Sequence, residues 1–172
     1  MNTIAQLDPQ IVWKNFYSLT QIPRPSKFEN EAAQFICDFG KNLGLESFRD
    51  EIGNVIIRKP ATPGMEDRMG VILQAHVDMV PQKNNDVEHD FKKDPIKPRI
   101  VDDMVYATGT TLGADNGLGC AVAMAVLESK ELVHGPIEVL ITIDEETGMT
   151  GARALKPGVL NGDILINLDS ET

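Results

Sequence analysis

Carboxylates and one histidine stand directly after short apolar runs at several places in this 172-residue sequence. An imidazole nitrogen together with carboxylate oxygens suits zinc, and also manganese or cobalt. Neighbouring carboxylates repel one another by about 1 kcal/mol or more per pair, and divalent cations relieve that repulsion. The residues concerned are His76, Asp78, Asp115, Asp144, Glu145, Glu146 and Asp169. Their types predict a metal site, provided that the fold gathers them.

The number of acidic groups favours two metal ions over one. Two divalent ions about 4 Å apart can share a carboxylate and a water molecule, whose pKa then falls toward neutrality. A neighbouring glutamate can accept the proton of that water, and hydrolysis of an amide follows. Asp78 stands two residues beyond His76, which suits a carboxylate that orients a metal-binding imidazole.

Each feature also has an alternative interpretation. A single histidine at a strand end is more often a hydrogen-bonded structural residue than a ligand, and Asp144-Glu145-Glu146 alone is typical of a charged turn. Asp169 alone is weak evidence, because acidic strand ends are common. The combination of these groups favours the metal site. For His89 and His134, which lie in polar surroundings, solvated surface roles are expected.

The segment around Asp115, residues 111–119, is rich in glycine. Such a segment can cradle a phosphate, but it lacks the Gly-Lys-Ser/Thr ending of a phosphate-binding loop. Val122 stands where the dinucleotide fingerprint requires its last glycine. Nucleotide binding is therefore disfavoured, and the glycines are expected to let the backbone bend and deliver Asp115 inward.

Three apolar runs predict buried strands that would position these groups: Gly70–Ala75, Ile137–Ile143 and Ile164–Leu168. They alternate with helical patterns, so the predicted fold is α/β, with a mixed, mainly parallel sheet flanked by helices. In open α/β sheets, ligands bind beyond the carboxyl ends of the strands. His76, Asp144 and Asp169 follow the three runs, so we expect them at one edge of the sheet.

The other elements are predicted from caps and periodicity. One helix is expected to begin at Asp8-Pro9, and a second behind a capping box over Ser26–Glu29. Short strands are expected at residues 45–49 and 55–58, and a hairpin around residues 102–103. A further helix is expected from Gly117, with an apolar face formed by Leu118, Ala121, Val122, Ala125 and Val126.

Composition narrows the classes of partner. The formal net charge of −10 argues against nucleic acid and anionic membrane surfaces as partners. The length suggests one domain, and neither a secretory signal nor a membrane-spanning apolar run is visible. Cys37 and Cys120 fall on the apolar sides of predicted helices, so buried free thiols are expected. A reducing cytoplasm fits these features.

At four positions the sequence resembles the motifs of the zinc dipeptidase, aminoacylase and carboxypeptidase superfamily, in the same order. The matching segments are His76-Val77-Asp78, Gly113–Gly117, Asp144–Gly148 and Asn167–Asp169. The residues of Gln74–Val80 and Thr111–Asn116 are most similar to the aminoacyl-histidine dipeptidases, also called cytosol non-specific dipeptidases or peptidase D. The resemblance covers essentially the whole chain and implies metal-dependent hydrolysis of small peptides, namely dipeptides (Xaa-His and broader).

The resemblance also implies a role for each residue. The implied ligands of the two divalent ions are His76, Asp115, Glu146 and Asp169. Asp115 would bridge the ions, while Glu146 would hold the one that His76 does not bind. Glu145 would be the general base and Asp78 would orient the histidine. The peptide bond between Asp115 and Asn116 is expected to be cis.

Members of this family extend well beyond the length of this sequence. Residues 1–172 are therefore expected to form the N-terminal part of the catalytic domain, without the lid and dimerisation domain and the C-terminal part. The absent part would supply a second histidine on the side of Glu146, and full-length relatives are expected to be homodimers. For this chain we expect weak metal binding, little or no activity, and an exposed sheet edge.

Two other functions stay open. One is an N-acyl amino acid amidohydrolase of the same superfamily, which a panel of dipeptides and N-acyl amino acids distinguishes from a dipeptidase. The other is a catalytically silent domain that only binds metal or a partner.

Overall fold

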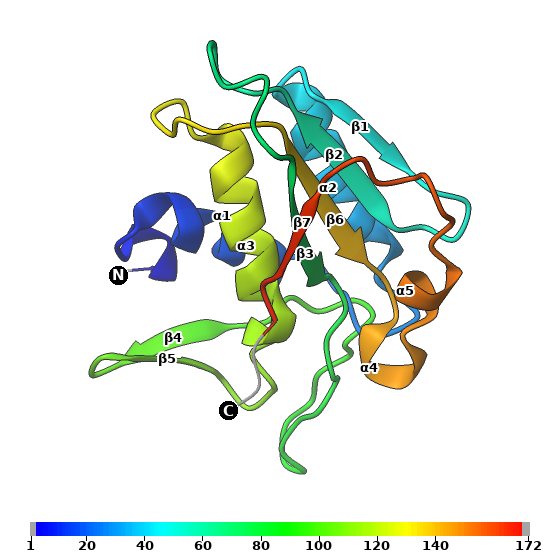
Figure 1. The fold of residues 1–172 in the computed structure, drawn as a ribbon. Coiled ribbons are helices and arrows are strands. Elements are labelled where there is room, and N and C mark those ends of the chain that lie inside the picture. Colours follow the sequence, from blue (N-terminus) through cyan, green and yellow to red (C-terminus); the bar gives the residue numbers. More distant parts are fainter. Residues whose placement is uncertain (1–2, 170–172) are drawn as a thin grey trace.

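The computed structural model describes residues 3–169, and a five-stranded sheet forms its centre (Figure 1). The strand order is β1-β2-β6-β3-β7. The strands are β1 (Glu46–Arg49), β2 (Val55–Lys59), β3 (Val71–His76), β6 (Ile137–Thr142) and β7 (Ile164–Asn167). β3 runs parallel to β6 and β7, whereas β2 is antiparallel to β1 and β6. The prediction of a mixed, mainly parallel sheet is confirmed.

The register of the parallel strands brings their carboxyl ends to one edge. His76 at the end of β3 is the partner of Thr142 at the end of β6, and Gln74 is the partner of Asn167 at the end of β7. The residues that follow the three strands therefore emerge side by side. Because β3, β6 and β7 run in the same direction, the residues that follow them lie in one region, at the carboxyl edge of the sheet.

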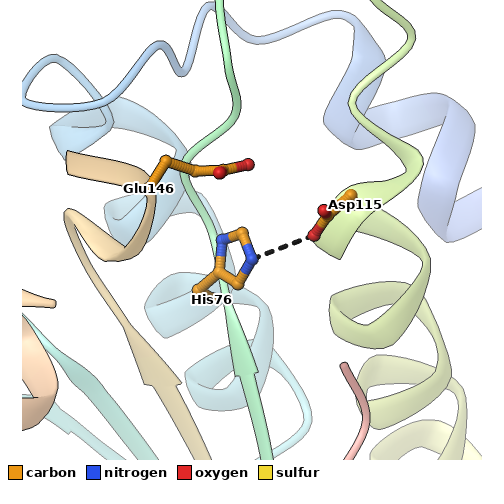
Figure 2. A group of neighbouring side chains, drawn as sticks. All are labelled: His76, Asp115 and Glu146. Carbon is orange, nitrogen blue, oxygen red and sulfur yellow. Dashed lines mark hydrogen bonds and ion pairs between the residues drawn. The ribbon is translucent and has the colours of Figure 1, made fainter. Parts of the chain in front are cut away.

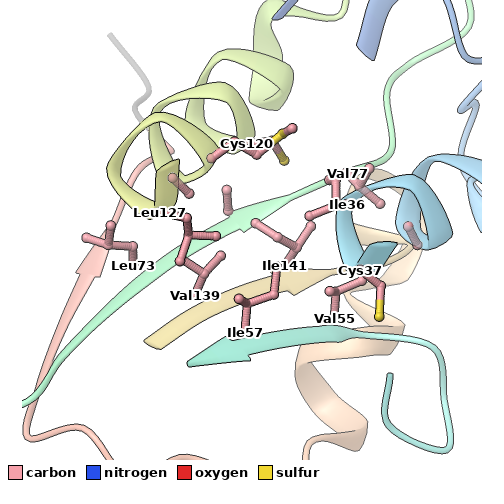
Figure 3. Close-up of a cluster of buried hydrophobic side chains, with 14 of the residues drawn as sticks. Ile36, Cys37, Val55, Ile57, Leu73, Val77, Cys120, Leu127, Val139 and Ile141 are labelled. Atoms are coloured by element: carbon pink, nitrogen blue, oxygen red, sulfur yellow. The ribbon is translucent and has the colours of Figure 1, made fainter. Parts of the chain in front are cut away.

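The helices are α1 (Gln10–Thr20), α2 (Asn30–Asn42), α3 (Ala114–Glu128), α4 (Glu145–Gly148) and α5 (Thr150–Ala154), after a short 3-10 turn η1 (Ile4–Gln6). α2 and α3 cover the same face of the sheet and share one core with it (Figure 3). Alternate strand residues such as Val55 and Ile57 point into that core, as the two-residue period of a strand requires. Cys37 and Cys120 are buried there as free thiols, as predicted.

The opposite face of the sheet is covered more thinly. Ile56, Ile72 and Leu140 pack there against Leu155 and neighbouring apolar residues of the segment that follows α5. The predicted hairpin is present as β4 (Pro98–Val101) and β5 (Met104–Ala107), and it forms a separate two-stranded sheet. Its Ile100 and Val105 pack against the cluster that α1 and α3 share. No helix of the described residues has the length and apolar character of a membrane span.

Two predicted helix starts, those of α1 and α2, differ from the structure. Pro9, rather than Asp8, is the N-cap residue of α1, which begins at Gln10, and no side chain caps it. α2 begins at Asn30, and no side chain caps it. The capping-box prediction for Ser26 and Glu29 is wrong, because the Ser26 hydroxyl donates to Asp78 (2.7 Å) and Glu29 accepts from the Asp144 amide (2.9 Å). The element α3 begins at Ala114, but its backbone is non-helical at Asp115 and Asn116, so regular helix starts at Gly117, as predicted.

Two predictions of burial are also wrong. β7 is an exposed edge strand, because it has β3 on one side only and Leu165 keeps 53% of its surface exposed. On α3 the predicted apolar face is rotated, since Val122 is 37% exposed while Ala123 and Met124 are buried. Alanine and glycine make α3 apolar on most sides, so periodicity alone could not orient it.

Candidate metal centre

His76 lies at the carboxyl end of β3 with only 1% of its side chain exposed. Its Nε2 atom is 3.1 Å from Oδ1 of Asp115, and this contact is drawn as a dashed line in Figure 2. Its Nδ1 atom lies 3.3 Å from Oδ1 of Asp78 and 3.1 Å from the carbonyl oxygen of the same residue. One ring nitrogen therefore faces the cluster of carboxylates, and the other faces a buried aspartate.

Carboxylates from three further segments surround the Nε2 atom of His76. His76, Asp115 and Glu146 each offer one ligand atom, and these atoms lie within 4.8 Å of one another (Figure 2). Oδ2 of Asp169 is 3.4 Å from Nε2, and Oε2 of Glu145 is 3.9 Å from it. The structure thus brings all of the residues that the sequence singled out to one edge of the sheet.

Asp78 is fully buried and joins two of these segments. Its carboxylate accepts hydrogen bonds from the backbone amides of Glu145 (3.0 Å) and Glu146 (3.3 Å), and from the Ser26 hydroxyl (2.7 Å). Burial would raise the pKa of Asp78, but the interactions with His76, the Glu145 amide and Ser26 outweigh it and hold that pKa below the usual value. Asp78 is therefore a charged anchor for both the imidazole and the Glu145 turn.

The electrostatics of the cluster favour a bound cation. Burial would lower the pKa of His76, but the hydrogen bond to Asp78 and the charges of Asp78, Asp169 and Glu145 raise it to about 9. Burial, and next the charge of Asp115, raise the pKa of Glu146. Without a metal ion, protons must therefore neutralise part of the cluster. An imidazole nitrogen with several carboxylate oxygens is also a donor set that zinc accepts, so these residues fit a divalent cation.

The turn that carries Asp115 is held on both sides. It begins at Gly113 with φ +68, and the peptide bond between Asp115 and Asn116 is cis, as predicted. The side-chain amide of Asn116 donates to the carbonyl oxygen of Leu168 (3.1 Å) and to Oδ1 of Asp169 (2.8 Å). Asn116 therefore connects the start of α3 to the end of β7.

The turn that carries Glu145 and Glu146 is held by buried polar residues. Asp144 adopts a left-handed conformation (φ 49, ψ 47), and its carboxylate accepts hydrogen bonds from the hydroxyls of Thr147 and Thr150. Oδ1 of Asn54 accepts from the amide of Ile143 (3.2 Å), while its side-chain amide donates to the carbonyl of Gly151 (2.9 Å). Asp144 thus has a structural role, and the following two glutamates reach the cluster.

The sequence analysis assigned no supporting role at the site to several residues that have one. They are Arg24, Ser26, Glu29, Asn54 and Asn116. Arg24, for example, is only 1% exposed although it lies between two prolines in a segment without regular structure. A polar residue in such a segment normally faces solvent, so sequence patterns carry no signal for its burial.

The other two histidines lie outside this cluster. Nδ1 of His134 is 2.7 Å from the carbonyl oxygen of Gly135, and His89 packs edge-on against Phe91 with ring centroids 4.5 Å apart. Both are half-buried, and Nε2 of His89 is buried with no hydrogen-bond partner among residues 3–169. The expectation of a solvated surface role is therefore wrong for His89.

Comparison with known proteins is consistent with this site. The chain is 55% identical over 171 residues to the cytosol non-specific dipeptidase of Escherichia coli K12, a match that covers 99% of this chain and 35% of the relative. Its fold superposes on a crystal structure of aminoacylhistidine dipeptidase from Vibrio alginolyticus with a TM-score of 0.97 and 58% identity, over 99% of this chain and 35% of that one. Aminopeptidase PepT from Bacillus cereus is more distant, with 28% identity and a TM-score of 0.80 over 96% of this chain and 44% of that one.

The relatives are longer than this chain, which spans 35 to 42% of the length of the curated proteins that it matches. Residues 72–168 match the family described as Peptidase family M20/M25/M40. That stretch contains His76, Asp115 and Glu146 together with Glu145. The chain belongs to Peptidase family M20/M25/M40.

Proposed function

We propose that this chain supplies the metal-binding edge of a dipeptidase active site. The observation that carries the proposal is the convergence of ligand atoms from His76, Asp115 and Glu146 within 4.8 Å of one another. Further support is the 55% identity to a protein named cytosol non-specific dipeptidase. By this analogy the substrates are small peptides, namely dipeptides (Xaa-His and broader), and the location is cytoplasmic.

The proposed cofactors are two divalent ions, with zinc as the first choice and manganese or cobalt as alternatives. The proposed ligands are His76, Asp115, Glu146 and Asp169. Asp115 would bridge the ions, because its Oδ1 atom lies beside Nε2 of His76 and its carboxylate is near that of Glu146. Asp169 would complete the His76 side, where its Oδ2 atom is 3.4 Å from Nε2.

The proposed reaction is hydrolysis of the peptide bond. Bound divalent ions would polarise the peptide carbonyl and lower the pKa of water. Glu145 would take a proton from the attacking water and deliver it to the leaving amine, a role that suits a carboxylate that is 31% exposed and lies 3.9 Å from Nε2 of His76. Asp78 would keep the imidazole of His76 in the orientation that presents Nε2 to the ion.

Residues 1–172 are proposed to be the N-terminal part of such a catalytic domain, with the lid and dimerisation domain and the C-terminal part outside this sequence. His76 is the single histidine of the cluster within residues 3–169, which supports the proposal that the Glu146 side lacks a nitrogen ligand in this chain. We therefore expect zinc titration calorimetry of this chain to show at most one site of useful affinity. The full-length protein is proposed to be a homodimer.

The function is tested in a chimaera in which this chain replaces the matching segment of the Escherichia coli dipeptidase. We expect the purified chimaera to hydrolyse dipeptides in the presence of zinc. Hydrolysis of N-acyl amino acids but not of dipeptides would favour an amidohydrolase. Zinc binding without turnover of either class would favour a silent metal-binding domain and would overturn the proposal.

A further inference from the structure

Arg24 is buried, and its guanidinium contacts two of the segments that carry proposed metal ligands. We infer that Arg24 is a positioning residue, which clamps the end of β3 to the Asp115 turn and thereby sets the separation of the ligands before a metal ion binds. The inference rests on the proposed metal site. It assigns Arg24 no contact with substrate or metal.

The contacts of the guanidinium join the two segments directly. Its Nη1 donates to the carbonyl oxygen of Val77 (2.8 Å), and its Nη2 donates to the carbonyl oxygen of Gly113 (2.5 Å). Val77 lies between His76 and Asp78, and Gly113 lies two residues before Asp115. A single planar group therefore spans the two places from which His76 and Asp115 arise, and the ligand atoms of these two residues are 3.1 Å apart.

The position of Arg24 is itself fixed by its backbone. The amide of Met79 donates to the carbonyl oxygen of Arg24 (3.1 Å), and the amide of Ser26 donates to the carbonyl oxygen of Met79 (3.3 Å). Pro25 and Met79 form an isolated parallel bridge. Because the backbone of Arg24 runs alongside residues 77–79, its side chain reaches the Asp115 turn from an anchored starting point.

Two glycines of the Asp115 segment leave space for the guanidinium. A Cβ atom added at Gly113 or at Gly117 would lie 2.5 Å from Nη2 of Arg24. Gly113 also has a φ of +68, which favours glycine by itself, but Gly117 has no such requirement. The absence of a side chain at Gly117 is therefore explained by the approach of Arg24, and also of Phe16, rather than by a bend of the chain.

The direction in which zinc affinity changes on mutation distinguishes a positioning role of Arg24 from a purely electrostatic one. Burial lowers the pKa of Arg24, and the charges of Asp78 and Asp115 act in the opposite direction. The guanidinium of an arginine keeps its proton at neutral pH even when it is buried. If Arg24 acted only through its charge, it would repel a divalent cation, and its neutralisation would tighten zinc binding. If Arg24 acts by positioning, its removal weakens zinc binding despite the loss of a repulsive charge.

The experiment measures zinc affinity and unfolding of the 172-residue chain in the variants Arg24→Lys and Arg24→Gln. Arg58 is the control, because its guanidinium also donates to a backbone carbonyl oxygen (Val159, 2.7 Å) and, unlike that of Arg24, to a buried carboxylate (Glu138, 2.9 Å), away from the cluster. We expect both Arg24 variants to bind zinc about 10–100-fold more weakly. Arg58→Lys and Arg58→Gln should bind zinc as the wild type does. In Arg24→Lys saturated with cobalt(II), the visible absorption should change, because it reports ligand geometry.

Unchanged or tighter zinc binding in folded Arg24→Gln would overturn the inference. If both Arg24 variants fail to fold, Gly117→Ala decides, because it displaces the guanidinium without removing it. Weaker zinc binding in that variant supports the inference, and unchanged binding overturns it.

If the wild type binds no zinc, the proposed metal site fails separately. In that case NMR of the metal-free Arg24→Lys or Gly117→Ala chain decides. Shifts of both the Asp78 and Ala114 amides support the clamp, and shifts of only one or neither overturn it.

Discussion

The backbone amide of Glu145 donates a 3.0 Å hydrogen bond to Oδ1 of Asp78, and the same oxygen lies 3.3 Å from Nδ1 of His76. One buried carboxylate oxygen therefore sets the distance between the proposed general base and a proposed metal ligand. Asp78, just after β3, and Glu145, in the turn after β6, are 67 residues apart in sequence. The relationship makes Asp78 the first target for mutation.

Replacement of Asp78 by alanine should weaken zinc binding by about 10–100-fold, because the imidazole loses the group that orients it. It should also lower the free energy of unfolding by about 1–3 kcal/mol, since the Glu145 amide loses its buried acceptor. Calorimetry with zinc and urea denaturation measure the two effects. Asp163→Ala is the control, because Asp163 also accepts from a backbone amide (Gly70, 2.8 Å) but at the other end of β3. Equal zinc affinity in the two variants would contradict the role of Asp78.

The adjacent residues Glu145 and Glu146 should respond differently to substitution by glutamine. In the chimaera, Glu145→Gln should reduce dipeptide hydrolysis by about 100-fold or more while zinc binding persists, because a proton acceptor is lost and no ligand is. Glu146→Gln should reduce zinc binding as well, because it removes a ligand oxygen. Kinetic assays combined with metal analysis of the purified proteins make the comparison. If Glu145→Gln lost its zinc and Glu146→Gln kept it, the roles of general base and metal ligand would be exchanged between the two residues.

Zinc affinity should depend on pH through His76, whose pKa is raised to about 9 in the metal-free chain. At neutral pH the imidazole is protonated and zinc must displace that proton, so affinity should fall by about tenfold for each pH unit below the pKa. Calorimetry in buffers of different ionisation enthalpy should show about one proton released per zinc ion at pH 7.5. Release of no proton would show that His76 is neutral before zinc binds.

The same shift predicts the sign of a stability change in the metal-free chain. The pKa of His76 is higher in the folded chain than its usual value of 6.5, so its contribution to stability is complete below pH 6.5 and is lost as the pH rises through about 9. Urea denaturation across this range should therefore show a decline in the wild type. The variant His76→Asn, which cannot titrate there, should show a smaller decline.

Gly151 should tolerate alanine poorly, whereas Gly148 in the same turn should tolerate it. A Cβ atom at Gly151 would lie 2.7 Å from the nitrogen and 2.8 Å from the oxygen of Ile143, and would also clash with Asn54. Such overpacking costs about 1–3 kcal/mol. At Gly148 the nearest atom would be the Thr150 hydroxyl at an ordinary 3.5 Å. Urea denaturation of Gly151→Ala and Gly148→Ala measures the difference, and equal stability would mean that the turn relaxes freely.

The exposed edge strand β7 should promote self-association of the chain. Its open side and its exposed Ile166 (45%) offer backbone and apolar partners to a second strand. Sedimentation velocity should therefore show association that increases with concentration and that Ile166→Lys reduces. Val133→Lys is the control, because Val133 is 72% exposed but lies in a loop. A chain that stays monomeric at high concentration would contradict the prediction.

The sequence by itself determined which residues gather at the site. Apolar runs end directly before His76 and Asp144, and parallel strands must present such ends at one edge of the sheet. The mixed, mainly parallel sheet, the hairpin around residues 102–103 and the cis bond after Asp115 were likewise predicted and are present. These features depend on local pattern or on motif, which the sequence displays directly.

Only the tertiary structure decided what holds those residues in place. Arg24 and Glu29 are buried by segments distant in sequence, and no periodicity marks a charged residue that the fold will enclose. The exposure of β7 and the rotation of α3 were decided in the same way, because an apolar strand or helix does not specify which neighbours cover it. The hydrophobic pattern indicates that a segment can be buried, whereas its actual burial depends on which other segments pack against it.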